Sequence, residues 1–374
     1  MTVYDLARAL ETWAPAASAQ SYDNVGLQVG RPLTEVDRVL VALDLTQAVL
    51  DEAVEIGAQL VVTHHPLIFR PLKRLVPGSY AQTLALKLAE QGIALYACHT
   101  NLDAAPAGVS FALAEQLGLE ETAFLESFPG ALVKLVTFVP GSHAEAVRLA
   151  LAEAGAGRIG DYDACSFETP GTGHFRALEG TNPYIGEAGG GIEDVDEIRI
   201  EAQVPRWSLR RAIAAMELAH PYEEVAYDVY PLDQPYSGAG LGVVGDLPEP
   251  ELLSAFLERV THRLGTPAVR YAGNPDMQIS RVAVCGGAGR DLIGKAVQAG
   301  ADAYVTADLT YHTFFEVLTE KGTPGMALID AGHYETEAMT EQLLVDWLSE
   351  RFTSVEFVRT QHRTSPIDTW VSEG

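Results

Sequence analysis

An internal repeat constrains the fold of this chain more than any other feature of its sequence. Residues 38–63 and residues 281–306 align without a gap, and nine of the aligned positions are identical. The identical positions include the arginine that opens each copy and the threonine that closes it. The repeat therefore predicts a core built from two similar halves.

Each copy of the repeat has the pattern of a β-α-β unit. A β-branched run predicts a first strand, an amphipathic stretch ending at a glycine predicts a helix, and an apolar run predicts a second strand buried on both faces. The predicted strands are 39–43, 60–63, 282–285 and 303–306, the helices are 48–56 and 292–299, and a further strand opens at 92–95 and at 325–328. Strands joined through a helix lie parallel. The predicted fold class is therefore α/β, with a duplicated β-α-β core and mostly parallel sheets.

Between the two copies, the sequence has a different pattern. Its strand-like and helix-like stretches follow one another in the order β-α-β-β-α-β, which is typical of a ferredoxin-like α+β domain. A glycine-rich stretch in the middle indicates a long loop. We therefore expect a discontinuous core, formed by residues 1–130 and 236–374, with residues 131–235 inserted as a ferredoxin-like domain.

Histidines and carboxylates gather where the parallel strands are expected to end. Ligands of parallel α/β sheets bind beyond the carboxyl ends of the strands. The polar residues that follow these strands are His64 and His65; His99, Asn101 and Asp103; Asp308 and His312; and His333, Glu335 and Glu337. Five of the ten histidines of the chain fall at this edge, which indicates one site rather than scattered surface residues.

The residue types at this edge are those of a metal site. Imidazole and carboxylate groups without a thiolate suit Zn, Fe, Mn, Ni or Co. His333 and Glu337 are four residues apart at the start of a predicted helix, so their side chains share a face. His64 and His65 are adjacent where the chain turns out of its strand. With Asp103 as a bridging carboxylate, these five ligands suffice for two divalent ions.

Other residues near this edge have more than one interpretation. Asp308, with His312 one helical turn later, either caps its helix or contacts substrate or the ligands. His99 is either structural or a group that transfers protons. Gly287 lies in a turn between a strand and a helix, which either contacts substrate or phosphate or serves only as a tight turn. Asp44, at the aligned position of the first copy, is interpreted as a turn residue.

Charge and cysteine content exclude several classes of function. The chain has 25 Lys and Arg against 51 Asp and Glu, a net charge of −26 that repels nucleic acids and anionic membrane surfaces. Its three cysteines, without a CxxC motif, form no disulfide framework. No apolar run reaches the roughly 18 residues of a membrane span, and the first residues lack the pattern of a signal peptide. We therefore expect a cytoplasmic protein that acts on a small molecule.

Four separated motifs resemble one known family. They are Ser-Tyr-Asp-Asn-Val-Gly-Leu-Gln-Val-Gly at 21–30, Thr-His-His-Pro-Leu at 63–67, His-Thr-Asn-Leu-Asp at 99–103 and Gly-His-Tyr-Glu-Thr-Glu at 332–337. Together they are similar to the dinuclear-metal-centre hexameric protein family, often labelled GTP cyclohydrolase 1 type 2-like. Through residues 175–180 and 220–224 the insert resembles the PII- and CutA-like domain of its longer bacterial members. The resemblance implies the same five ligands and a ring-shaped homohexamer, with metal sites facing an internal cavity and inserts capping its openings.

These observations predict a metal-dependent hydrolase in which two metal ions activate water. Glu335 or His99 is the candidate for proton transfer. The expected substrate is GTP, opened at its imidazole ring, or another nucleotide or phosphoester. Two alternatives remain open. One is a metal-binding regulatory or metal-delivery protein without catalysis, and the other is a scaffold in which the metal only joins the two halves of the core.

Overall fold

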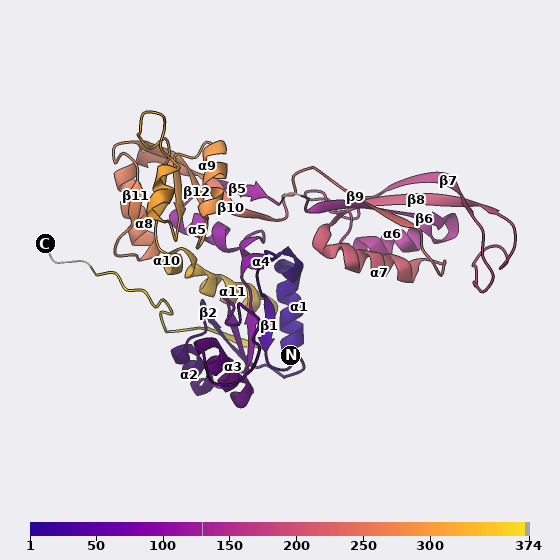
Figure 1. The fold of residues 1–374 in the computed structure, drawn as a ribbon, viewed down its shortest axis with the longest axis horizontal. Helices are drawn as coiled ribbons and strands as arrows, with labels where there is room; N and C mark the ends of the chain where they lie inside the picture. The colour runs from indigo at the N-terminus through magenta and orange to yellow at the C-terminus, as the bar shows by residue number, and fades with distance from the viewer. Residues whose placement is uncertain (129, 371–374) are drawn as a thin grey trace. The chain divides into compact units, whose positions relative to one another are not determined.

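The computed structural model describes residues 1–128 and 130–370, which fall into two compact units (Figure 1). The core unit comprises Met1–Ser127 and Gly238–Gly374, and the inserted unit comprises Phe128–Ser237, each within the described residues. Among these residues, every helix is too short or too polar to cross a lipid bilayer.

The first sheet of the core unit contains the first copy of the repeat. Its five strands lie in the order β1-β4-β3-β2-β15, where β2, β3, β4 and β15 run parallel and β1 pairs antiparallel with β4. The strands are β1 (Gly26–Val29), β2 (Arg38–Ala42), β3 (Leu60–Thr63), β4 (Ala94–Ala97) and β15 (Glu356–Arg359). Every residue of β3 and β4 is buried, as expected for strands covered on both faces.

Local signals in the sequence set the helices that connect these strands. Thr46 and Ser79 each accept a hydrogen bond from the backbone N–H three residues on, and so begin α2 (Gln47–Glu55) and α3 (Tyr80–Gln91). Helix α3 ends at Gly92, whose φ of 71° lies in the left-handed region that glycine adopts without strain. Both helices pack on the first sheet with apolar side chains.

The second sheet of the core unit contains the second copy. Its six strands lie in the order β11-β14-β13-β12-β10-β5, with β12, β13 and β14 parallel and the other pairs antiparallel. The strands are β5 (Glu120–Ser127), β10 (Gly240–Leu252), β11 (Arg270–Ala272), β12 (Gln278–Val284), β13 (Ala303–Thr306) and β14 (Ala327–Asp330). The helix predicted over 292–299 begins as a 3-10 turn, Arg290–Leu292, and continues as α9 (Ile293–Gln298). The prediction of an α/β fold with a duplicated core is confirmed.

The two halves of the core unit exchange their last elements. Helix α5 (Val109–Leu117) and β5 belong to the first half, but β5 pairs with β10 and Leu113 packs in the core of the second sheet. Helix α11 (Met339–Arg351) and β15 belong to the second half, but β15 pairs with β2 and Leu344 packs in the core of the first sheet. The same two cores are filled further by α1 (Val3–Trp13) and α8 (Leu253–Leu264). Each sheet is therefore completed by the other half.

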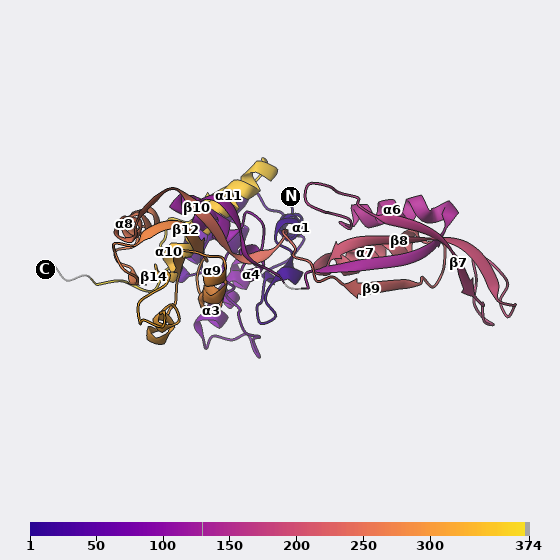
Figure 2. The ribbon, with the colours of Figure 1, turned by 90° about the horizontal axis from the view of Figure 1, so that it is seen from above.

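The inserted unit has its own sheet and its own core. Its antiparallel strands lie in the order β7-β8-β6-β9 and run along the unit in Figure 2. The elements are β6 (Leu132–Pro140), α6 (Ala144–Glu153), β7 (Phe167–Phe175), β8 (Glu193–Pro205), α7 (Leu209–Ala219) and β9 (Tyr227–Pro231). Apolar side chains of α6 and α7 pack against one face of the sheet. This β-α-β-β-α-β order is the connectivity of ferredoxin-like domains.

Candidate metal centre

The predicted ligands reach one place from both sheets of the core unit. His64 and His65 directly follow β3, and His99 lies between β4 and the short helix α4 (Thr100–Asp103). From the second sheet, β14 leads into α10 (His333–Glu337). The ligand atoms form three groups within which all atoms lie within 4.8 Å of one another: His64, His65 and His99; His65, His333 and Glu337; and His64, Asp103 and Glu337. The structure thus brings the five predicted ligands and His99 together.

Glu337 is the carboxylate that two of these groups share. Its Oε1 lies 3.7 Å from Nε2 of His64, whereas its Oε2 lies 3.0 Å from Nε2 of His65. Nε2 of His333 is 3.1 Å from the same Oε2. Asp103 belongs to one group, with its Oδ1 3.6 Å from Nε2 of His64. Glu337 therefore belongs to two of the groups, whereas Asp103, predicted as the bridging carboxylate, belongs to one, because α10 carries Glu337 between the ligands of the first sheet.

Each histidine of the centre is oriented by an oxygen atom behind it. In every case Nδ1 donates to that oxygen, which leaves Nε2 as the ring nitrogen that can bind a metal ion. The contacts are His64 to the carbonyl of Cys98 at 2.7 Å, His65 to Asp44 at 2.7 Å, His99 to Asp23 at 2.9 Å and His333 to Asp308 at 2.8 Å. Such outer contacts are the usual support of metal-binding histidines.

Two of these supporting carboxylates were missed by the sequence analysis. Asp44, interpreted as a turn residue, accepts hydrogen bonds from His65 and from the hydroxyl of Thr364. Asp23 lies in a motif that was noticed but given no role, and it accepts from His99 and from the hydroxyl of Thr100. Asp44 follows β2 closely, so the rule that located the ligands at strand ends would have included it.

Three buried polar atoms of the centre lack a hydrogen-bond partner among the described residues. They are Nε2 of His64, Oδ1 of Asp103 and Oε2 of Glu337. A buried polar atom without a partner costs about 1–3 kcal/mol, so native structures rarely leave one. A cation beside Nε2 of His64 and Oδ1 of Asp103, which lie 3.6 Å apart, would satisfy these two atoms, and a cation beside Oε2 of Glu337 would satisfy the third. The residues present therefore fit a divalent metal ion.

The carboxylates favour positive charge at the centre. Burial lowers the pKa of His65, but its contacts with the carboxylates of Asp44 and Glu337 outweigh burial and raise it to about 10. Burial also lowers the pKa of His333, and its contacts with Glu337 and Asp308 raise it to about 9. Without metal, these imidazoles hold protons in the space where a divalent cation would carry the charge.

Burial raises the pKa of both central carboxyl groups, but their neighbours leave them with opposite net shifts. Burial raises the pKa of Glu337, but the neighbouring imidazoles of His333, His64 and His65 hold it well below its usual range. Burial raises the pKa of Asp103 to about 7, although His64 acts against this shift. Glu337 is therefore the permanent negative charge of the centre.

Gly287 gives the carboxylate of Glu337 the room that it needs. Its φ is 59°, and a Cβ atom at this position would lie 2.2 Å from Oε1 of Glu337. The Gly287 N–H donates to the hydroxyl of Thr336, which fixes the turn against α10. Contact of Gly287 with substrate stays a prediction, but its position beside a ligand has a steric reason.

Asp308 supports a ligand rather than a helix end. It has a left-handed φ of 58° and accepts from His333, whereas the following 3-10 turn is preceded by Thr310. The interpretation of Asp308 as a helix cap is wrong.

Two other predicted residues lie apart from the ligand groups. Glu335 pairs with Arg363 at 2.6 Å. His312 is exposed beside Tyr311, with 5.3 Å between the ring centroids, and joins none of the ligand groups found in residues 1–128 and 130–370.

Comparisons with known proteins find relatives over nearly the whole chain. The sequence profile of the Duf34/NIF3 (NGG1p interacting factor 3) family matches residues 1–366. The chain is 39% identical to the "GTP cyclohydrolase 1 type 2 homolog" of Halalkalibacterium halodurans over 361 residues, which cover 96% of each chain. It is 42% identical to the protein of the same name from Bacillus subtilis over 332 residues, which cover 88% of each chain.

Solved structures agree with this relationship. A crystal structure described as a Bacillus cereus protein related to NIF3 is 39% identical, with a TM-score of 0.82 over 99% of each chain. The structure of Staphylococcus aureus protein SA1388 is 31% identical, with a TM-score of 0.76 over 99% of each chain. On the evidence of its sequence profile and of these relatives, the chain belongs to the Duf34/NIF3 family.

Proposed function

We propose that this protein is a metal-dependent hydrolase whose centre holds two divalent first-row ions. The observation that carries the proposal is the position of Glu337, whose two carboxylate oxygens face two different sets of ligands. His64 and Asp103 would hold one ion with Glu337, and His65 and His333 would hold the other with it. Each ion then has three protein ligands, the number that catalytic zinc sites use.

The chemistry of the donors narrows the choice of metal. Imidazole and carboxylate donors suit Zn, Fe, Mn, Ni or Co, and the buried thiol of Cys98 is no competitor because burial raises its pKa and keeps it protonated. When bound, such ions lower the pKa of a water molecule toward neutrality and polarise the bond under attack.

One side of the centre is open, which favours catalysis over closed storage. His64 is fully buried, whereas the side chains of His65, Asp103 and His333 are 22%, 22% and 32% exposed. Water and a small substrate can therefore approach these three residues. His99 lies at the same place with Asp23 holding its Nδ1, so its Nε2 is the group that we propose accepts a proton.

The proposed substrate class is a nucleotide or another phosphoester. The curated relatives carry the name of a GTP cyclohydrolase homolog, and opening the imidazole ring of GTP is a hydrolytic reaction that releases formate. The second candidate is a metal-delivery or regulatory protein, which the same ligands would serve without turnover.

Metal content and turnover of one protein sample test the proposal. Tag-free protein never exposed to chelator is analysed by mass spectrometry and then assayed with GTP and a phosphoester panel in the presence of the metal found. We expect about two ions per chain, turnover of at least one substrate, and loss of both in Glu337→Gln but not in His312→Ala. Two ions without turnover favour metal delivery. A metal content near zero after incubation with Zn, Mn, Fe and Ni salts contradicts both functions.

We also propose, from the family resemblance, that six copies of the chain assemble into a ring. Light scattering coupled to size-exclusion chromatography measures the mass directly. A mass of one or two chains contradicts this proposal.

A further inference from the structure

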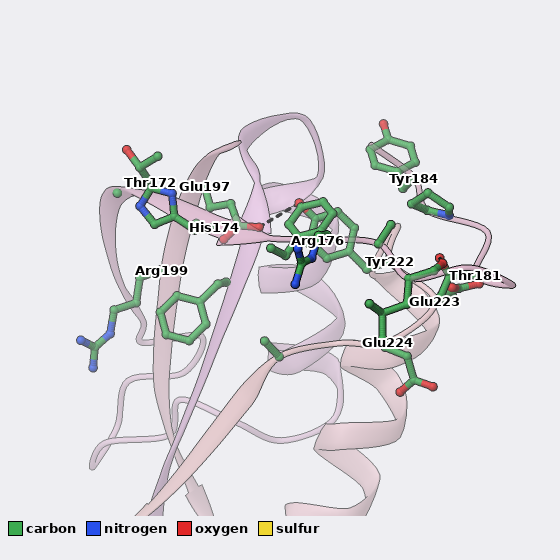
Figure 3. A pocket seen from close by; sticks show the side chains of 18 of the residues that line it. Thr172, His174, Arg176, Thr181, Tyr184, Glu197, Arg199, Tyr222, Glu223 and Glu224 are labelled. Carbon is green, nitrogen blue, oxygen red and sulfur yellow. Dashed lines mark hydrogen bonds between the residues drawn. The ribbon is translucent and has the colours of Figure 1, made fainter. Parts of the chain in front are cut away.

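The inserted unit contains a cavity of about 710 Å³ that the metal centre does not use (Figure 3). Strand β7, strand β8 and the segments around Leu178 and Tyr222 line it. Residues 175–178 and 222–224, within the two motifs of the insert for which the hydrolase has no role, lie in its walls. The cavity is large enough for a drug-sized molecule or a nucleotide.

One face of the sheet forms the floor of this cavity. Along β8, Ile198 and Ile200 pack toward the helices, so the alternating Glu197 and Arg199 point to the opposite face. Gly173 on β7 lies beside Glu197, and a Cβ atom there would come within 2.1 Å of its Oε2. The glycine keeps the floor clear.

Aromatic rings form the wall. The ring of Tyr222 lies 5.9 Å from that of Phe175 and 6.2 Å from that of Tyr184, measured between centroids. The Tyr222 hydroxyl donates to Oε1 of Glu197 at 2.8 Å, which fixes the ring in place. Such a wall favours a flat ring that can stack or meet it edge to face.

Charged groups of both signs line the cavity, and Glu197 lies on the same side as His174 and Arg199. Figure 3 shows His174 and Arg199 on one side, Glu223 and Glu224 on the other, and Arg176 between them. Within residues 1–128 and 130–370, neither Arg176 nor Glu224 has an ion-pair or hydrogen-bond partner for its side chain. By contrast, His174 contacts Asp194, Arg199 contacts Glu201, and Glu223 accepts from the backbone N–H of Asn182.

We propose that this cavity binds a small amphoteric aromatic molecule. Its flat ring lies against Tyr222, its anionic group meets Arg176, and its N–H donors meet the carboxylates of Glu223 and Glu224. Purine nucleotides and aromatic amino acids share this chemistry. The site lies in the inserted unit, so it does not depend on the proposed hydrolase.

Two fluorescent dyes test the anionic end of the site on the full-length, metal-loaded chain. Anilinonaphthalene sulfonate has a flat ring and a negative charge, and N-phenyl-1-naphthylamine has a similar ring without the charge. We expect Arg176→Gln to weaken binding of the charged dye by about tenfold and to leave the neutral dye unchanged. Tyr222→Leu should weaken both.

The matched control is Arg210→Gln, an exposed arginine of α7 outside the cavity. Melting temperature and metal content of all variants should equal those of the parent chain. Equal weakening of the charged dye by Arg176→Gln and Arg210→Gln would overturn the proposal, as would unchanged binding of both dyes to Tyr222→Leu.

Displacement of the charged dye distinguishes the two sources of the ligand. Displacement by GMP assigns a nucleotide. Displacement by tryptophan, but not by indole-3-propionate, which lacks the amine, assigns an amino acid. If neither GMP nor tryptophan displaces the dye, the proposal of an amphoteric ligand is contradicted. It is also contradicted if GMP fails and tryptophan and indole-3-propionate displace the dye equally.

Discussion

Replacing Asp308 by asparagine tests the two-ion arrangement because Asp308 supports one ligand group. Its Oδ2 accepts from Nδ1 of His333 at 2.8 Å, and His333 belongs to the group with His65 and Glu337. The φ of 58° at this position suits asparagine as well as aspartate. The substitution therefore removes a charge behind one ligand without straining the backbone.

The expected magnitude follows from the role of such contacts. Loss of the carboxylate behind a metal-binding histidine costs about 10–100-fold in metal affinity, or about 1.4–2.8 kcal/mol. Only the ion near His333 should be affected, because His64 and Asp103 hold the other ion. Equilibrium dialysis over a series of free zinc concentrations, followed by metal analysis, should show one ion leaving Asp308→Asn at a higher free zinc concentration than in the parent chain.

The matched control is Asp346→Asn, an exposed aspartate of α11 that bonds Gln342. Its metal-binding curve should equal that of the parent chain, and the metal-free melting temperature should be unchanged in both variants. A parallel loss of both ions in Asp308→Asn, or a curve that matches the control, would refute the assignment of two separate groups.

Three further predictions concern the same centre. Gly287→Ala should remove both ions, because the added Cβ would clash with the carboxylate of Glu337. It should also lower the free energy of unfolding in urea by about 1–3 kcal/mol, because alanine is strained at a left-handed φ. Unchanged metal content would contradict this prediction. His312→Ala should leave the metal content unchanged, and a lost ion would restore His312 to the site. In metal-free protein the raised pKa values of His65 and His333 add stability that is complete below pH about 6.5 and is lost as the pH rises through about 9 and 10. Melting curves should therefore show stability falling from pH 7 to pH 10, and a rise would count against the assignment.

The sequence predicted the members of the ligand groups because their positions at strand ends follow from backbone topology. A repeat of β-α-β units forces parallel strands, and parallel strands place the residues after their carboxyl ends at one edge. Within the first sheet this rule groups His64, His65 and Asp103, and within the second sheet it groups His333 and Glu337. That the two groups meet depends on how the two sheets pack against each other, which the rule does not predict.

Which residue of the centre contacts which other residue depends on side-chain packing, and the sequence pattern does not predict that packing. That Glu337 rather than Asp103 is shared depends on how α10 lies between the sheets. The pairing of Glu335 with Arg363, and of Asp44 with Thr364, joins the site to a C-terminal segment that has no regular pattern. Strand β15 was missed for a related reason, since its four half-exposed or exposed residues resemble a loop until β2 pairs with them.

Because the two halves exchange their last elements, the first sheet is begun early in synthesis but completed only after the second sheet has been made. Strand β2 is among the first strands synthesised, but its partner β15 is the last. During translation the growing first sheet therefore keeps an open edge, a surface that invites pairing with other chains. The inserted unit draws its core from its own residues and can close long before that. The chain thus carries a domain that can mature early inside one that cannot mature until β15 has been made.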